Sequence, residues 1–156
     1  MTSAGQAGRN EDLVAVGPDP IDHSALIVSV SGPQCGAVAL FLGTVRDHSD
    51  GIEGVTHLEY EVYDDVVEQK IAEIVGEARA KWEVERVAAV HRVGSLEVGE
   101  ASVAVAVGSG HRAEAFAAAR YIIDELKARV PVWKKEHWPG GAKWVREDLE
   151  HAPKGD

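Results

Sequence analysis

A cluster of basic residues near the C-terminus has the clearest chemical meaning in this sequence. Residues 127–136 read Lys-Ala-Arg-Val-Pro-Val-Trp-Lys-Lys-Glu, whereas the whole chain of 156 residues has 16 Lys and Arg against 26 Asp and Glu, a formal net charge of -10. Positive charge gathered in an acidic protein indicates a site for an anion. A run of charge also commonly marks a solvated surface. The cluster therefore predicts either an anion site or an exposed basic face.

Lys127 lies at the end of a predicted helix. Residues 112–130 contain neither Gly nor Pro, and their apolar residues recur at a spacing of three and four, which is typical of an amphipathic helix. Pro131 ends it. Lys127 falls beside Phe116 at the edge of the apolar stripe, and Arg120 shares its side of the helix. Burial and a like charge would both favour the neutral amine and suit Lys127 to proton transfer. Alternatively, its stem covers the core edge while its head stays in water.

The same helix begins after a glycine-bracketed turn. Gly108-Ser-Gly-His-Arg112 follows a strand-like run, and the free N–H groups of a first helical turn bind anions well. His111 and Arg112 would add donors to a phosphate. Ser and Gly also occur in such turns merely as caps. This end of the helix lies roughly 20 Å from Lys127, so other segments must fold back to complete a single pocket.

The remaining pattern alternates strands and helices and predicts an α+β fold with mixed strand pairing. Residues 94–99 are expected to turn, and 47–54 to form a polar loop. Gly76, inside a helix capped by Asp64, indicates a close helix contact. Strands are expected at 13–16, 37–42 (a buried strand), 55–63, 87–92, 101–107, 132–133 and 142–145, and helices at 21–30, from Asp64 to Trp82, and at 112–130.

Length and composition predict one globular domain over residues 11–146, with a flexible tail at 1–10 and a frayed tail at 147–156. No signal pattern or apolar run of 18 residues is present, so we expect a cytoplasmic protein without membrane contact. The acidic balance argues against a nucleic-acid partner. Cys35 is the only cysteine, and the seven histidines show no metal-ligand spacing, so we expect no protein-bound metal.

Several of these segments together resemble the large, catalytic subunit of molybdopterin synthase, the MoaE family. The resemblance runs over residues 13–145, and its most specific feature is the order Gly-x-Val-Arg, then His-Arg, then Lys-x-Arg-x-Pro-x-Trp-Lys. The segments that carry it are Phe41–Arg46, His91–Gly94, Ser109–Arg112, Ala119–Lys127 and Val130–Glu136.

The resemblance implies an α/β hammerhead-type fold, a mixed sheet with packed helices and a small β subdomain. It also implies a sulfurtransferase of molybdenum cofactor biosynthesis that works as a homodimer within a heterotetramer. A small ubiquitin-like carrier with a Gly-Gly C-terminus supplies sulfur as a thiocarboxylate, and the acceptor is cyclic pyranopterin monophosphate (precursor Z), which becomes the dithiolene of molybdopterin. No prosthetic group is implied.

Carried over by position, the family pattern implies a site of cations with one acid. Lys127 would act as general acid/base and Lys134 would neutralise an anion, which makes these two the catalytic candidates. His111 and Arg112 would orient the phosphate, either within one chain or across the dimer interface. We expect structural roles for Trp82, His91 and Phe116. The substrate-binding candidates are Thr44, Val45, Arg46, His111, Arg112, Lys127, Lys134, Lys135 and Glu136.

Two rival interpretations remain at this point. The His111-Arg112 turn would also suit a phosphate-ester transferase of another class, which needs no protein partner. The cations would also suit a noncatalytic dimeric module that docks an acidic tail. The sequence ends in Lys-Gly-Asp and not Gly-Gly, so we expect that this protein is not itself the carrier.

Overall fold

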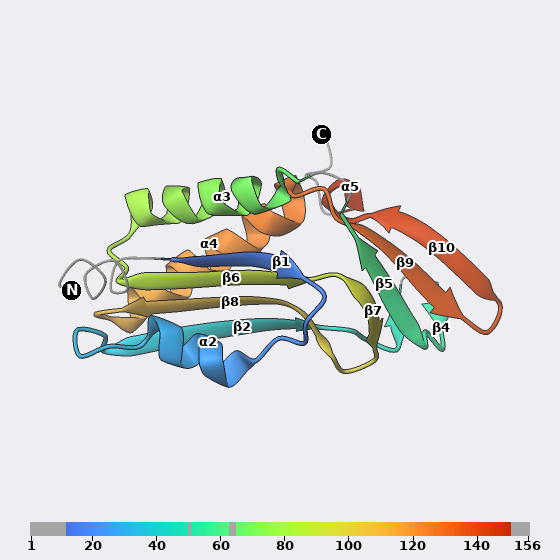
Figure 1. Cartoon of the computed structure of the whole chain (residues 1–156), viewed down its shortest axis with the longest axis horizontal. Helices are drawn as coiled ribbons and strands as arrows, with labels where there is room; N and C mark the ends of the chain where they lie inside the picture. The colour runs from blue at the N-terminus through green and yellow to red at the C-terminus, as the bar shows by residue number, and fades with distance from the viewer. Residues whose placement is uncertain (1–11, 50, 63–64, 151–156) are drawn as a thin grey trace.

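A four-stranded mixed sheet forms the centre of the molecule (Figure 1). The computed structural model describes residues 12–49, 51–62 and 65–150. The strand order is β1-β6-β8-β2, with β1 parallel to β6 and the other neighbours antiparallel. This confirms the predicted mixed pairing. The strands are β1 (Leu13–Gly17), β6 (Arg86–Arg92), β8 (Ala101–Ser109) and β2 (Ala37–Thr44).

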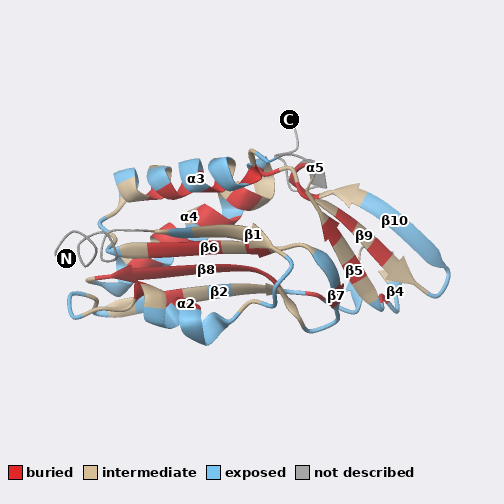
Figure 2. Cartoon of the chain, in the orientation of Figure 1, coloured by how far each residue is buried: buried red, intermediate tan, exposed pale blue. Residues whose placement is uncertain are grey.

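Helices cover both faces of this sheet. The two longer helices, α3 (Val67–Lys81) and α4 (Arg112–Arg129), pack on one face, and α2 (His23–Val30) packs on the other. Successive side chains of a strand point to opposite faces. In β8 the larger valines therefore face α3 and α4, while Ala104 and Ala106 face α2. Figure 2 shows β8 as a continuous buried strand between its neighbours.

A second sheet lies beyond one end of the first and forms the expected small β subdomain (Figure 1). Its order is β10-β9-β5-β7. The prediction of a turn at 94–99 is wrong for its first four residues, because they pair with β5 as strand β7. The strands are β10 (Gly141–Arg146), β9 (Trp133–Trp138), β5 (His57–Glu61) and β7 (Gly94–Glu97), and a hairpin of β3 (His48–Ser49) and β4 (Ile52–Glu53) lies within the expected loop.

Strand β2 is at an edge of the first sheet and is not the buried strand that its apolar run predicts. Val38 and Phe41 are 39% and 38% exposed, and Phe116 of α4 is 68% exposed. Phe116, for which we expected a structural role, is thus largely exposed to solvent. The helical stripe continues to this edge, but beyond β2 the described chain has no further strand to cover it.

The predicted ends of the chain are only partly within the described residues. The tail at 1–10 and the cap at Asp64 lie outside them, and α3 begins after Val66, which makes no side-chain cap bond. The prediction of a frayed tail from residue 147 is wrong for its first residues. Glu147 and Asp148 are only 2% and 7% exposed, and they begin helix α5 (Glu147–Glu150). Among the helices that the structure describes, none is long and apolar enough to cross a membrane.

Gly76 does not mark the close helix contact that we expected. A Cβ built at Gly76 meets nothing within 4 Å, so Gly76→Ala should raise the free energy of unfolding by about 0.5–1 kcal/mol, because alanine stabilises a helix interior relative to glycine. Urea denaturation measures this change. Gly108→Ala should have the opposite effect, since its Cβ would lie 1.9 Å from the Val30 carbonyl oxygen. An unchanged or lower midpoint for Gly76→Ala would contradict the prediction.

Candidate functional site

A cavity of about 240 Å³ lies where the two sheets meet, and it contains three of the cations that we expected at an anion site, Arg46, Lys127 and Lys134. We call it the Lys127 cavity. The first sheet contributes the ends of β2 and β8, the second contributes β5 and β9, and α4 and α5 close it. Its lining residues are Gly43, Thr44, Arg46, His48, Val55, Leu58, Tyr60, Ser102, Lys127, Lys134, Glu136 and Glu147.

An irregularity in β2 directs two predicted residues into the cavity. The pairing of β2 with β8 shifts between Gly43 and Thr44, and such a bulge redirects the side chains that follow it. Thr44 and Arg46 line the cavity. Val45 between them is buried in the core, and its N–H donates to the Glu100 carbonyl at 3.0 Å. Val45 therefore anchors this segment and does not line the cavity.

The four cations of residues 127–135 divide among three places. Lys134 is 9% exposed and lines the cavity, together with Glu136. Lys135 lies between them on β9 and points to the other face, where its Nζ is 5.5 Å from the centre of the Trp144 ring. Arg129 donates to both carboxylate oxygens of Glu77, at 2.6 and 2.9 Å. Only two of the four cations, Lys127 and Lys134, therefore belong to the cavity.

The Arg129 contact also explains why Arg129 is unavailable to the cavity. Its hydrogen bond, helped by one from Tyr121, lowers the pKa of Glu77 to about 2. Glu77 belongs to α3, so this ion pair joins the two long helices. Similarly, Trp144 holds the charge of Lys135 on the outer face of the second sheet. The structure thus gives no support to substrate binding by Lys135.

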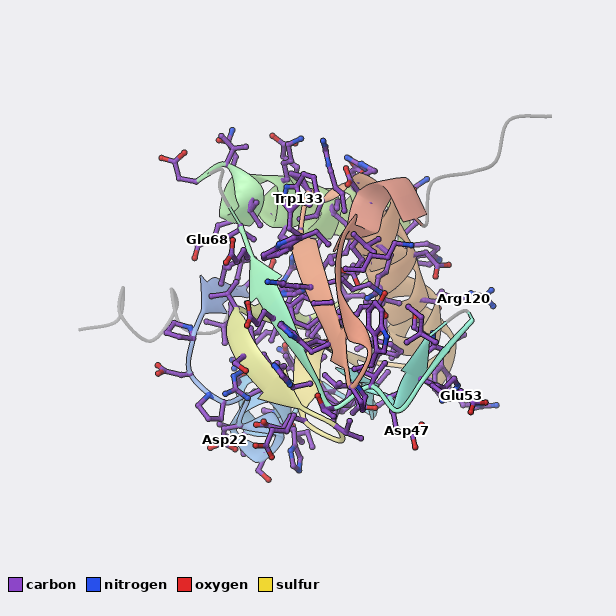
Figure 3. The ribbon with its side chains drawn as sticks, turned by 90° about the vertical axis from the view of Figure 1, so that its right-hand side faces the viewer. Asp22, Asp47, Glu53, Glu68, Arg120 and Trp133 are labelled. Carbon is purple, nitrogen blue, oxygen red and sulfur yellow. The ribbon has the colours of Figure 1, made fainter. Side chains whose placement is uncertain are left out.

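Lys127 has a carboxylate partner and not the cationic neighbour that we expected. Its Nζ donates to Glu147 Oε1 at 2.5 Å, and its side chain is 25% exposed. Arg120 is 82% exposed and pairs with Asp124, and it lies at the periphery of the molecule (Figure 3). The expectation of a like charge beside Lys127 is therefore wrong, because Arg120 turns to solvent.

Glu147 is the most buried acid of the cavity, with a side chain 3% exposed. Burial by itself would raise its pKa, but the interactions with His91 and Lys127 outweigh this and hold it at about 2. A buried charge needs such partners to remain charged. His91 Nε2 lies 3.9 Å from Glu147 Oε2, close enough for an electrostatic interaction but too far for a hydrogen bond. At neutral pH the cavity therefore contains a permanent carboxylate beside Lys127.

The balance of charge in the cavity is positive. Three cations line it, Arg46, Lys127 and Lys134, against two acids, Glu136 and Glu147. The excess is unusual in a chain with a formal net charge of -10. Low-dielectric walls strengthen the field of such a group of charges. The cavity is therefore suited to an anionic ligand.

His111 and Arg112 do not reach this cavity within one chain. Both are exposed and lie at the start of α4, roughly 22 Å of helix away from Lys127 at a rise of about 1.5 Å per residue. His111 precedes the helix without a side-chain cap bond. Within one copy of the chain, the anion-binding site predicted at this turn is thus separate from the Lys127 cavity.

Sequence reasoning did not assign to the site either Glu147, which lines the cavity, or His91, which lies 3.9 Å from Glu147. Glu147 follows the last strand in a segment that we expected to be frayed, and no local pattern marks it. His91 was expected to be structural, and it is indeed fully buried, yet it faces Glu147. The His-Arg pair of the family pattern was the available signal for His91, but only its position 3.9 Å from the Glu147 carboxylate in the folded chain reveals its partner.

One group of described residues has the donor atoms for a metal ion. His57, Glu59 and His137 offer ligand atoms within 4.8 Å of one another, a donor set that Zn²⁺ accepts. Pairing of β5 with β9 brings His57 opposite His137, and their rings stack with centroids 4.1 Å apart. Residues eighty positions apart show no spacing motif, so sequence could not reveal this group. The absence of a bound metal stays a prediction.

Comparisons with known proteins agree with this architecture. The model of a family described as "MoaE protein" matches residues 16–129. The molybdopterin synthase catalytic subunit of Halalkalibacterium halodurans is 41% identical over 136 residues, 87% of this chain and 86% of that protein. The crystal structure of molybdopterin synthase from Staphylococcus aureus is 36% identical with a TM-score of 0.79, over 85% of this chain and 96% of that one.

A third match shares the fold at low sequence identity. It is a protein-protein complex of subunits 1 and 2 of molybdopterin-converting factor from Helicobacter pylori. The matching chain is 17% identical with a TM-score of 0.69, over 89% of this chain and 92% of that one. The similarity to both solved structures thus extends over most of the fold that builds the cavity.

Proposed function

This chain belongs to the MoaE protein family, and we propose how its Lys127 cavity carries out the work of a molybdopterin synthase catalytic subunit. Such a subunit is a sulfur-transferring enzyme, and that activity also explains the gathered cations. The comparisons favour this activity over a noncatalytic docking module and over a phosphate-ester transferase of another class.

The observation that carries the proposal is a single cavity with three cations and a buried carboxylate. The acceptor, cyclic pyranopterin monophosphate, carries a phosphate, and the donor is the C-terminal thiocarboxylate of a carrier protein. Both are anions that must be brought together. Arg46, Lys127 and Lys134 can neutralise them in a region of low dielectric. Holding both reactants side by side supplies much of the rate enhancement.

Sulfur transfer would proceed through an acyl-linked intermediate. The thiocarboxylate sulfur attacks an oxygen-bearing side-chain carbon of the pterin precursor. The carbon–sulfur bond forms as a carbon–oxygen bond breaks, and the departing oxygen keeps the electron pair and takes a proton from Lys127. Water then cleaves the bond between the acyl carbon and sulfur, releasing the carrier as a carboxylate and leaving sulfur on the product. Lys127 acts as general acid/base and stabilises the oxyanion formed during hydrolysis. Lys134 neutralises the thiocarboxylate or phosphate, and Thr44, Arg46 and Glu136 contact the substrate.

The partner in this scheme is a small ubiquitin-like carrier with a Gly-Gly C-terminus. The complex from Helicobacter pylori, which has a chain of the same fold, consists of two different subunits, and this supports a two-subunit enzyme here. Two sulfurs are needed for each product. The half-sulfurated intermediate would therefore remain in the cavity between two carrier visits. No prosthetic group is required, since the carrier supplies the sulfur.

A second copy of the chain would complete the site. An apolar hollow at the β2 edge is lined by Leu40, Phe41, Phe116 and Ile123, among others, and exposed apolar surface of this kind marks interaction sites. His111 and Arg112 lie on the same helix as Phe116 but far from the cavity of their own chain. Contact between two β2 edges would explain both observations, with the phosphate-orienting pair supplied across the interface.

Reconstitution tests the proposed function directly. The chain is mixed with a thiocarboxylated carrier and cyclic pyranopterin monophosphate, and product is followed after oxidation to its fluorescent derivative. Product should require all three components. A carrier that binds without any product forming would show that the fold and partner are those of the family but the chemistry is not.

A further inference from the structure

Three side chains from distant parts of the sequence lie next to one another at the cavity. Lys127 of α4 contacts Glu147 of α5 through Oε1, at 2.5 Å. The other oxygen, Oε2, lies 3.9 Å from Nε2 of His91 on β6. The Glu147 backbone is fixed as well, because its N–H donates to the Val132 carbonyl at 2.8 Å. A single carboxylate thus stands between an amine and an imidazole.

A backbone contact fixes the tautomer of the neutral His91 ring and leaves its other nitrogen as a buried acceptor. Its Nδ1 lies 2.9 Å from the Arg92 carbonyl oxygen, which can only accept, so Nδ1 carries the proton. In the neutral ring, Nε2 is then an unprotonated acceptor. It is buried and has no hydrogen-bond partner in the described structure. A buried polar atom without a hydrogen bond costs free energy. The position of Nε2 beside Glu147 suggests that it can accept a proton.

The ring of His91 is also fixed from a second side. Tyr60, which lines the cavity, packs at an angle of 67° to it with centroids 5.3 Å apart. The other charged groups that line the cavity near this trio are Lys134 and Glu136 of β9 and, after β2, Arg46 and His48. Glu147 is the lining residue that forms an ion pair with Lys127 and also lies near His91.

We propose that Glu147 positions Lys127 and that His91 is the internal proton acceptor for it. This deepens the proposed function and rests on Lys127 being its acid/base. When Lys127 must act as a base, the N–H bond at its Nζ breaks and the proton passes to the Glu147 carboxyl. The carboxyl group then turns so that it closes the 3.9 Å gap to His91 Nε2, and an N–H bond forms there. Lys⁺, Glu⁻ and neutral His become neutral Lys, Glu⁻ and His⁺, so the net charge of the trio stays constant.

The constant net charge explains why such an arrangement suits a buried site. Loss of the Lys127 proton to water would leave Glu147 as an unpaired buried carboxylate, which is costly. Transfer to His91 keeps a cation next to it throughout. The neutral Lys127 amine takes a proton from water as the water oxygen bonds to the acyl carbon, and it gives that proton to sulfur as the carbon–sulfur bond breaks. His91 then returns its proton to Lys127, and the released carboxylic acid loses its proton to solvent. His91 and Glu147 act through Lys127 and are positioning residues.

Two substitutions test the trio, with a matched control. Glu147→Gln keeps the shape but removes the relay, and His91→Asn keeps an amide donor for the Arg92 carbonyl but removes Nε2. Each should lower kcat roughly 10- to 100-fold with KM for cyclic pyranopterin monophosphate little changed. The double variant should be no worse than either single one, because both interrupt one path. Asp148→Asn is the control, since Asp148 is buried in the same helix but pairs with Arg146.

A readout without turnover separates this inference from the proposed function. Acetylation of Lys127 by acetic anhydride, followed by peptide mass spectrometry, reports how available its amine is to a reagent. Glu147→Gln should speed this labelling several-fold, because Nζ is no longer held in an ion pair with a buried carboxylate, and Asp148→Asn should not. Wild-type protein without product would overturn the proposed function, whereas the labelling result would still decide the role of Glu147.

Equal kcat and equal labelling for Glu147→Gln and Asp148→Asn would overturn the inference. Additive losses in the double variant would also overturn it, since they would mean two separate roles. If His91→Asn does not fold, as judged by circular dichroism, the Glu147→Gln comparison and its labelling still give the answer.

Discussion

Lys127→Ala should lower turnover by at least about 100-fold while leaving carrier binding intact. General acid/base catalysis contributes about 10² to 10⁴ in rate, and Lys127 is the cation of the cavity that is both partly exposed and paired with a buried carboxylate. The carrier should still bind, because one lysine is a small part of a protein-protein interface. Single-turnover formation of the fluorescent product measures the first effect, and calorimetric titration with the carrier measures the second.

Lys127→Ala also leaves the buried Glu147 carboxylate without an ion-pair partner, so a second variant is needed. Without Lys127, the buried Glu147 carboxylate loses its ion-pair partner, which destabilises the fold. The double variant Lys127→Met with Glu147→Gln removes the amine without leaving that charge, and it should be equally inactive. Lys81→Ala is the control, because Lys81 lies over the Tyr121 ring at the end of α3, away from the cavity. Near wild-type turnover in the double variant would rule out an acid/base role for Lys127.

Mixing two inactive variants should restore activity if the site is shared between copies. Arg112→Ala and Lys127→Ala would each inactivate a homodimer. A mixed dimer would have one site in which Lys127 of one copy and Arg112 of the other are both intact. Random exchange between symmetric dimers then gives about a quarter of wild-type activity. The assay is product formation after co-refolding or prolonged mixing, with the mixed dimer quantified by native mass spectrometry.

The matched control pairs two residues of the same cavity. Lys127 and Lys134 line one cavity within a single chain, so a mixture of Lys127→Ala with Lys134→Ala has one defect in every site of the mixed dimer and should stay inactive. Activity in this mixture would contradict the assignment of both lysines to one copy. A mixed Arg112 and Lys127 dimer that forms but stays inactive would show that His111 and Arg112 do not serve the partner's cavity.

Local pattern alone was sufficient for most helices and strands. Spacing of apolar residues depends on the segment itself, so helix α4 and the strands β1, β2, β6 and β8 were found close to their observed bounds. The family resemblance likewise rested on short motifs, and the comparisons confirm it. Thr44, Arg46, Lys127, Lys134 and Glu136 were named from those motifs, and the structure brings all five to one cavity.

The features that the sequence pattern did not predict depend on contacts between distant segments of the chain. Residues 94–97 became a strand because β5 offered an edge to pair with. The Phe116 side chain is exposed because β2 is the edge strand of the first sheet. Lys135 turned away from Lys134 because side chains alternate on a strand, a fact that matters only once β9 has a cavity on one face.

The sequence by itself thus determined the family, the chemistry expected of it and the five residues that meet at the cavity. Only the tertiary structure showed that Glu147 stands between Lys127 and His91. The physical reason is that helix and strand periodicity are properties of adjacent residues, whereas a buried ion pair depends on the desolvation and approach of groups 20 and 56 positions apart.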